Sequence, residues 1–201
     1  GQEARSLLAP GVMDSSIDKQ ALNQIRANAS ETALLNDCAD RMTRAASFAE
    51  AMGVMSQALR QLTPITTCAF YRYDAASDSL TCSLATGDSN RYLTGLTIRL
   101  GERVSGWCAA NKRTSMNSDA SLDLFHIAGL FLPVLRSTIA VPIAEDDRLV
   151  GVLTGYSVLD QPFNEAHLYA FERTAEFLKE RLDVAVPQNR SVIPFRASRT
   201  S

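Results

Sequence analysis

The chain has 201 residues, 46% of them hydrophobic, and a formal net charge of −2. This length suits one domain of ordinary size with an appendage, and the apolar content is enough to fill a core. The 20 basic and 22 acidic residues are mixed along the chain. No basic stripe is therefore present to neutralise phosphates, and nucleic acid is not expected as a partner.

The apolar runs, such as residues 127–135, are much shorter than the roughly 20 residues that span a bilayer. The first residues show no signal-peptide pattern, so we expect a cytoplasmic location and no membrane partner. The sequence begins at Gly1 rather than at methionine, which suggests an excised fragment or a tag remnant, so that a signal or neighbouring domain could have been removed.

Four cysteines lie far apart in the sequence, and the chain has two histidines. A structural zinc site usually takes its ligands as two closely spaced pairs, so no metal site is predicted. Cys68 and Cys82 lie in strand-like runs and are expected to be small buried residues. A disulfide framework is not expected.

Residues 1–14 show no sustained period and are interpreted as a lead-in. A helix is predicted over 15–46, because a serine pair can cap it and neither proline nor glycine interrupts it. Ile25, Leu35 and Met42 lie on one narrow apolar stripe of this helix. The stripe favours a seam between the subunits of a homodimer, although it also fits a helix that lies across its own domain.

Helices and strands follow one another over the rest of the chain. Ser47 and Glu50 have the spacing of a capping box, at the start of a helix that Pro64 ends. The connection at 119–136 is too apolar for a loose surface loop, and the tail at 187–201 is expected to be a flexible linker or terminus. Helical spacing predicts helices over 47–62, 104–111 and 163–186. Alternation predicts strands over 67–74, 79–87, 96–100, 114–118, 138–144 and 148–158.

This order of elements predicts an α+β fold with a central antiparallel sheet of about six strands. The N-terminal and C-terminal helices are expected to cover one face of the sheet. The connections at 87–97 and 119–136 are expected to roof the other face, where a ligand pocket would lie.

Five segments in this order resemble the GAF domain, a sensing and dimerisation module of bacterial signalling proteins that is related to PAS domains. They are CAFYRYD at 68–74, LTIRLGERVSGW at 96–107, STIAVPI at 137–143, RLVGVLTGYS at 148–157 and FNEAHLYAFERTAEFL at 163–178. The resemblance implies a GAF domain over 47–186. It also implies a non-catalytic regulatory module that binds an unidentified small molecule and controls a covalently linked effector domain.

Residues 125–143 are also similar to the segment around the catalytic site of the family's enzymes that reduce free methionine sulfoxide. Their chemistry requires a nucleophilic thiolate and a resolving thiol. Where those enzymes carry cysteines, this chain has Ser105 and Gly129. Reductase activity is therefore not expected, and the chain is predicted not to be an enzyme.

The sequence does not identify a cofactor. Asn111 and Lys112 lack the rest of the pattern of cyclic-nucleotide-binding relatives, and Cys108 lacks the companions of a bilin-binding cysteine. A lone histidine such as His126 is more often a packing residue than a haem ligand. Cys108 is interpreted as packing beside Trp107.

A ligand is expected at the start of the 104–111 helix, because exposed amides there favour an anion or an acceptor. The alternative is a dimerisation scaffold without a ligand, whose pocket is filled by Phe125, Phe131 and Leu132. The candidate ligand-binding residues are Tyr71, Ser105, Gly106, Trp107, Cys108, His126 and Tyr156.

Overall fold

Two hairpins form the centre of the sheet in the computed structural model, which describes residues 15–185. β1 (Thr67–Asp74) pairs with β2 (Ser79–Gly87), and β5 (Ser137–Glu145) pairs with β6 (Arg148–Ser157). β1 and β6 join the hairpins as antiparallel neighbours, with Ala69 opposite Thr154. Alternating residues and polar turns specify these strands locally, and both strands of the first hairpin have the predicted bounds.

Two short strands complete the sheet at its edges. β3 (Thr97–Arg99) pairs with β2, and β4 (Ser115–Asp119) pairs with β5. The strand order is β3-β2-β1-β6-β5-β4, with every pair antiparallel. The predicted α+β fold with six strands is therefore confirmed.

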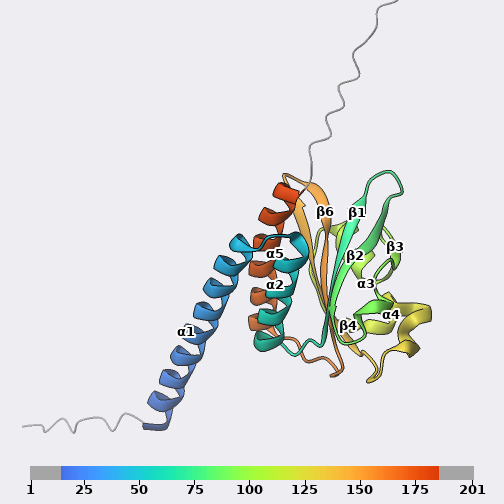
Figure 1. Ribbon diagram of the computed structural model, residues 1–201. Coiled ribbons are helices and arrows are strands. Elements are labelled where there is room, and N and C mark those ends of the chain that lie inside the picture. The colour runs from blue at the N-terminus through green and yellow to red at the C-terminus, as the bar shows by residue number, and fades with distance from the viewer. Residues whose placement is uncertain (1–14, 186–201) are drawn as a thin grey trace, which may run out of the picture.

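One face of the sheet is covered by α2 (Phe48–Leu62) and α5 (Glu165–Ala185), as Figure 1 shows. Ser47 Oγ accepts a hydrogen bond from the Glu50 amide at 3.1 Å, and Glu50 Oε2 accepts one from the Ala46 amide at 2.9 Å, so both residues of the predicted capping box are used. The core on this face includes Met52, Met55, Leu59, Phe70, Leu153, Phe171 and Leu178.

The first helix, α1 (Ser15–Arg44), has two unlike halves. Leu35 and Met42 are buried within the chain's own fold, where Met42 joins the core formed with α2 and α5. Residues 18–33 are all exposed, and this half of α1 extends away from the domain in Figure 1. The predicted dimer seam is therefore revised: of its three residues, Ile25 alone is exposed, and the C-terminal half of the helix lies across its own domain.

The other face of the sheet carries shorter elements, α3 (Arg103–Asn111), α4 (Ala120–Leu124) and the 3₁₀ turns at Asn90–Tyr92 and Phe125–Leu130. We call residues 120–136 the roof segment, because they lie over this face (Figure 1). The predicted long connection thus contains a helix and a 3₁₀ turn. A second core beneath it includes Leu80, Leu93, Ile98, Cys108, Leu124 and Phe131.

Within residues 15–185, no helix is long and apolar enough to cross a membrane. The predicted lead-in at 1–14 and tail at 187–201 lie outside the described residues.

Candidate functional site

Five polar side chains are buried together between the sheet and the roof segment. β1 and β6 supply three of them, α3 supplies one and α4 supplies one. Each is fully buried although it carries a hydroxyl or carboxyl group. They are Tyr71, Ser105, Asp123, Thr154 and Tyr156.

The Asp123 carboxylate is the centre of this cluster. Its Oδ1 accepts hydrogen bonds from the Val104 amide at 2.9 Å and the Ser105 amide at 2.8 Å. Its Oδ2 accepts from Ser105 Oγ at 2.5 Å and from the Tyr156 hydroxyl at 3.1 Å. Two donors therefore converge on each oxygen, which is full coordination of a buried carboxylate.

Two further hydroxyls extend the cluster along the sheet. Thr154 Oγ1 lies 2.8 Å from Ser105 Oγ, and the hydroxyls of Tyr71 and Tyr156 lie 2.6 Å apart. An ionised carboxylate has no proton to give, so Ser105 and Tyr156 both donate to Asp123. Thr154 then donates to Ser105, and Tyr71 donates to Tyr156. One charge thus orients every hydroxyl proton in the cluster.

Burial and hydrogen bonding act in opposite directions on the acid. Burial raises the pKa of Asp123, and the hydrogen bonds from Ser105, Tyr156 and the Val104 amide oppose that increase. Burial, together with the charge on Asp123, raises the pKa of Tyr71 and of Tyr156 well above the ordinary tyrosine value. Both phenols consequently stay protonated and remain donors at neutral pH.

The start of α3 is suited to receive this carboxylate. Its N-cap residue, Glu102, makes no side-chain capping bond, so Asp123 takes the first amides of the helix instead. The positive end of the helix dipole also favours a negative charge here. Arg103 closes the outside of the site, because its guanidinium donates to the Asp123 carbonyl oxygen at 3.0 Å and stacks 5.3 Å from the Phe125 ring centroid.

Three of the predicted ligand-binding residues, Tyr71, Ser105 and Tyr156, meet in this cluster. Gly106 lies in α3, where a Cβ would collide with the Arg99 carbonyl oxygen, so close packing of α3 on β3 explains this glycine. The sequence analysis therefore identified three of the five cluster residues, and it wrongly included Gly106, a packing position, among the ligand-binding candidates.

The other candidates lie apart from the cluster. Trp107 is 42% exposed and is therefore not a core residue. It lines a surface hollow of about 390 Å³ together with Leu122 of α4. Cys108 is fully buried in the second core, and His126 is exposed beside Phe125, with the two ring centroids 6.1 Å apart.

The sequence analysis did not identify Asp123 and Thr154 as site residues. The available signal for Asp123 was its position: it is the one charged residue in the apolar run from Leu122 to Leu135. An acid in such a run is rarely buried without partners. Two of its partners lie 18 and 19 residues earlier in the chain and Tyr156 lies 33 residues later, and only the folded structure brings them together.

Burial makes the four cysteines unreactive. It raises the pKa of Cys38 to about 11 and the pKa of Cys68, Cys82 and Cys108 to about 12. All four are free and buried. At neutral pH they are protonated thiols rather than thiolates.

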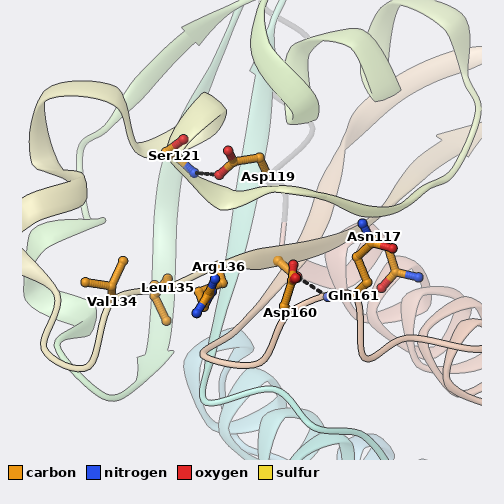
Figure 2. A pocket seen from close by; sticks show the side chains of 9 residues that line it. Asn117, Asp119, Ser121, Val134, Leu135, Arg136, Asp160 and Gln161 are labelled. Atoms are coloured by element: carbon orange, nitrogen blue, oxygen red, sulfur yellow. Dashed lines mark hydrogen bonds between the residues drawn. The ribbon is translucent and has the colours of Figure 1, made fainter.

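A separate hollow of about 600 Å³ opens at one end of the sheet, shown in Figure 2. Its polar side chains hold the surrounding backbone. Asp119 Oδ1 accepts from the Ser121 amide at 2.8 Å, and the Asn117 amide group exchanges two hydrogen bonds of 2.9 Å with the Phe163 backbone. These contacts shape the loops around the hollow. Among residues 15–185, no three His, Cys, Asp or Glu side chains are grouped as metal ligands.

The chain is thus an α+β domain. Its sheet carries long helices on one face and the roof segment on the other, and the polar cluster lies between the sheet and the roof segment. The chain belongs to the GAF domain family, whose model matches residues 45–180. No curated protein matches it.

Solved structures share this fold. The GAF domain of an Acinetobacter phosphoenolpyruvate-protein phosphotransferase matches with a TM-score of 0.65 and 16% identity, over 78% of this chain and 94% of that one. A free methionine-R-sulfoxide reductase from Neisseria meningitidis, in complex with its substrate, matches with a TM-score of 0.64 and 25% identity, over 79% and 93%. The GAF domain of a Coxiella burnetii phosphoenolpyruvate-protein phosphotransferase gives 0.62 and 18%, over 78% and 97%.

Proposed function

We propose that this chain is a non-catalytic regulatory GAF module that binds a small molecule beneath the roof segment. Occupancy is passed to a covalently linked effector domain through the terminal helices. The module acts in the cytoplasm, since four free buried thiols fit a reducing compartment.

The observation that carries this proposal is the buried Asp123 cluster. Removing a carboxylate from water is costly, and a buried charged network is seldom more stabilising than apolar residues of the same shape. The domain already has an apolar core on this face. A polar cluster in the middle of that core is therefore better explained by binding than by stability.

The cluster also bears on the alternative of a scaffold with a filled pocket. Phe131 is buried, with its ring centroid 5.7 Å from that of Tyr92. Phe125 and Leu132, the other two residues expected to fill the pocket, are 70% and 81% exposed. The donors at the start of α3 are thus occupied by a carboxylate of the chain itself rather than covered by apolar side chains, which favours a sensor over a scaffold.

The similarity to the Neisseria reductase makes methionine sulfoxide reduction the second candidate function. Its chemistry needs an accessible thiolate and a second thiol. Ser105 stands at the buried start of α3, and Cys108 has a pKa near 12. An alkoxide at Ser105 is not accessible at neutral pH, so we assign no reductase role to this chain.

Native mass spectrometry of the purified chain, followed by a metabolite screen, tests the proposed function. Trp107 is the single tryptophan, and it lines one hollow with Leu122, which neighbours Asp123. A ligand beneath the roof segment should therefore give a saturable change in tryptophan emission. The response should be lost in Ser105→Leu, which fills the start of α3 without adding a second tryptophan. A saturable ligand that leaves both readouts unchanged would move the site elsewhere.

A parallel assay addresses the second candidate. We expect no thioredoxin-dependent turnover of free methionine sulfoxide. Turnover that disappears in Cys108→Ser would assign catalysis to this chain and contradict the non-catalytic proposal.

A further inference from the structure

The hydrogen bonds of Asp123 are divided between two parts of the molecule. The donors, at Val104, Ser105 and Tyr156, belong to α3 and β6. The carboxylate belongs to the roof segment. The contact therefore has the form of a carboxylate ligand in a protein site, with two donors on each oxygen, except that the ligand is tethered to the same chain.

The roof segment is only partly packed on the rest of the domain. Three of its large apolar side chains, Leu124, Phe131 and Leu135, are buried. Five others face solvent: Leu122, Phe125, Leu130, Leu132 and Val134. A segment with so little buried apolar surface opens at a lower free-energy cost than the core of its domain.

The backbone of the roof segment is also strained two residues beyond Asp123. Phe125 has φ 42° and ψ −111°, which is strained for a bulky residue. The Asp123 hydrogen bonds tie this strained part of the roof segment to α3 and β6. The closed form is therefore held by the Asp123 contact together with the packing of Leu124 and Phe131.

We propose that Asp123 is an internal ligand that keeps the site closed, and that a small molecule with a carboxylate group takes the same four donors when the roof segment opens. This inference rests on the proposed function and deepens it by naming the ligand class and the regulatory contact. The external carboxylate and Asp123 compete for one set of donors, so binding shifts the population from closed to open.

The shape of the site favours a carboxylate. The donors address two oxygens in pairs, as a flat carboxylate requires, and the Thr154 and Tyr71 hydroxyls behind them are already oriented as donors. A neutral amide of the same shape would direct N–H groups toward donors.

Chemical rescue of Asp123→Ala in the full chain tests the proposal. This variant removes only the carboxylate, so formate fits the vacated position. We expect the Tm of the variant to fall below that of the wild type. We then expect sodium formate to raise it saturably by a few degrees beyond the effect of sodium chloride at equal ionic strength. Formamide and inorganic phosphate should act no better than chloride. A folded variant on which formate and chloride act alike would overturn the proposal, and larger rescue by phosphate would overturn the ligand class.

Two matched variants serve as controls. Asp119→Ala removes an exposed carboxylate that caps α4 nearby, and formate should not rescue it beyond chloride. Adding Ser105→Ala to Asp123→Ala removes one donor and should weaken formate binding at least fivefold. Equal formate affinity with and without Ser105 would contradict binding at this site.

A second variant decides the matter if Asp123→Ala does not fold. Asp123→Asn preserves the shape of the side chain but places N–H groups where two donors now point. We expect amide hydrogen exchange in the roof segment to become at least tenfold faster, with exchange in α2 and α5 unchanged. Wild-type exchange in the roof segment would overturn the proposal.

The two proposals fail separately. Formate rescue requires no knowledge of the natural ligand, so its failure concerns the Asp123 site alone. A metabolite screen without a hit concerns the proposed function, and it leaves the rescue result standing.

Discussion

Asp123 has the role of a helix N-cap residue for α3, although it lies 19 residues beyond Val104 in the chain. An N-cap residue normally precedes its helix directly and satisfies the first free amides. Here Glu102 leaves those amides free of a side-chain bond, and α4 delivers the acceptor. The start of α3 and the position of the roof segment are therefore coupled through one side chain.

The pKa of Asp123 gives this coupling a pH dependence. Burial raises the folded-state pKa above the ordinary value of 3.8. The folded protein therefore keeps this proton to higher pH than the unfolded chain does. The unfolding free energy contributed by Asp123 is then greatest below pH 4 and is lost as the pH rises through the folded pKa.

The difference in unfolding free energy between the wild type and Asp123→Asn isolates this effect. We expect the difference to decrease with rising pH above 4, by at most about 1.4 kcal/mol per pH unit. Urea unfolding between about pH 4 and 7.5 measures it. A difference that grows with pH would mean that the four donors, rather than burial, determine the pKa of Asp123.

The cysteines allow a second prediction at this scale. With pKa values of about 11 for Cys38 and about 12 for the other three, at most about one thiol in a thousand is ionised at pH 8. We expect Ellman's reagent to react slowly with the native chain and to titrate four thiols in guanidinium. Rapid reaction of Cys108 would contradict its packing role and strengthen the reductase reading.

Among the elements, β6 connects the site with the terminal helices. Thr154 and Tyr156 point toward the Asp123 cluster, whereas Gly155 between them faces the opposite side of the sheet. A Cβ at Gly155 would collide with the Phe171 ring of α5 and would lie 2.8 Å from Ile65 Cγ2. α5 thus packs directly behind the strand that holds two cluster residues.

Gly155→Ala tests this close packing. We expect it to lower the unfolding free energy by about 1–3 kcal/mol, because the methyl group overpacks a filled core. Gly53→Ala is the matched control: it lies in α2 with no atom within 4 Å of the added Cβ, and it should stabilise the domain by about 0.5–1 kcal/mol. Denaturant unfolding compares the two. A neutral Gly155→Ala would mean that α5 is free to move away from β6.

The elements were easier to predict than the contacts between them. The bounds of β1 and β2 follow from local alternation and a polar turn, so the local sequence is enough to predict them. The sequence also shows an apolar stripe on α1, but a stripe does not say whether its partner belongs to the same chain. Leu35 and Met42 pack against the chain itself. The Asp123 cluster depends on contacts 18 to 85 residues apart, which no local pattern records.

At the scale of the whole molecule, the exposed half of α1 lacks a partner within the described residues. Residues 18–33 would extend for about 24 Å as a helix, and an isolated helix of this length is marginally stable in water. Leu22 and Ile25 are 47% and 64% exposed on one side of it. A mainly apolar hollow of about 280 Å³ beside Leu35 and Tyr169 lies further along α1. We propose that a second copy of α1 covers this side.

The last prediction is a homodimer held by the N-terminal half of α1. Each Leu or Ile side chain that becomes fully buried contributes about 1.5–3 kcal/mol, and a symmetric contact buries each residue twice. Light scattering should therefore give twice the 21.9 kDa of one chain. The double variant Leu22→Asp, Ile25→Asp should be a monomer whose core still unfolds cooperatively, since neither residue contacts that core. Gln20→Asp, Gln24→Asp adds the same charge on the opposite side of α1 and should remain a dimer. Dimers of equal strength in both variants would place the interface on another surface, because two aspartates per chain cannot be buried together in an apolar seam without a large loss of affinity.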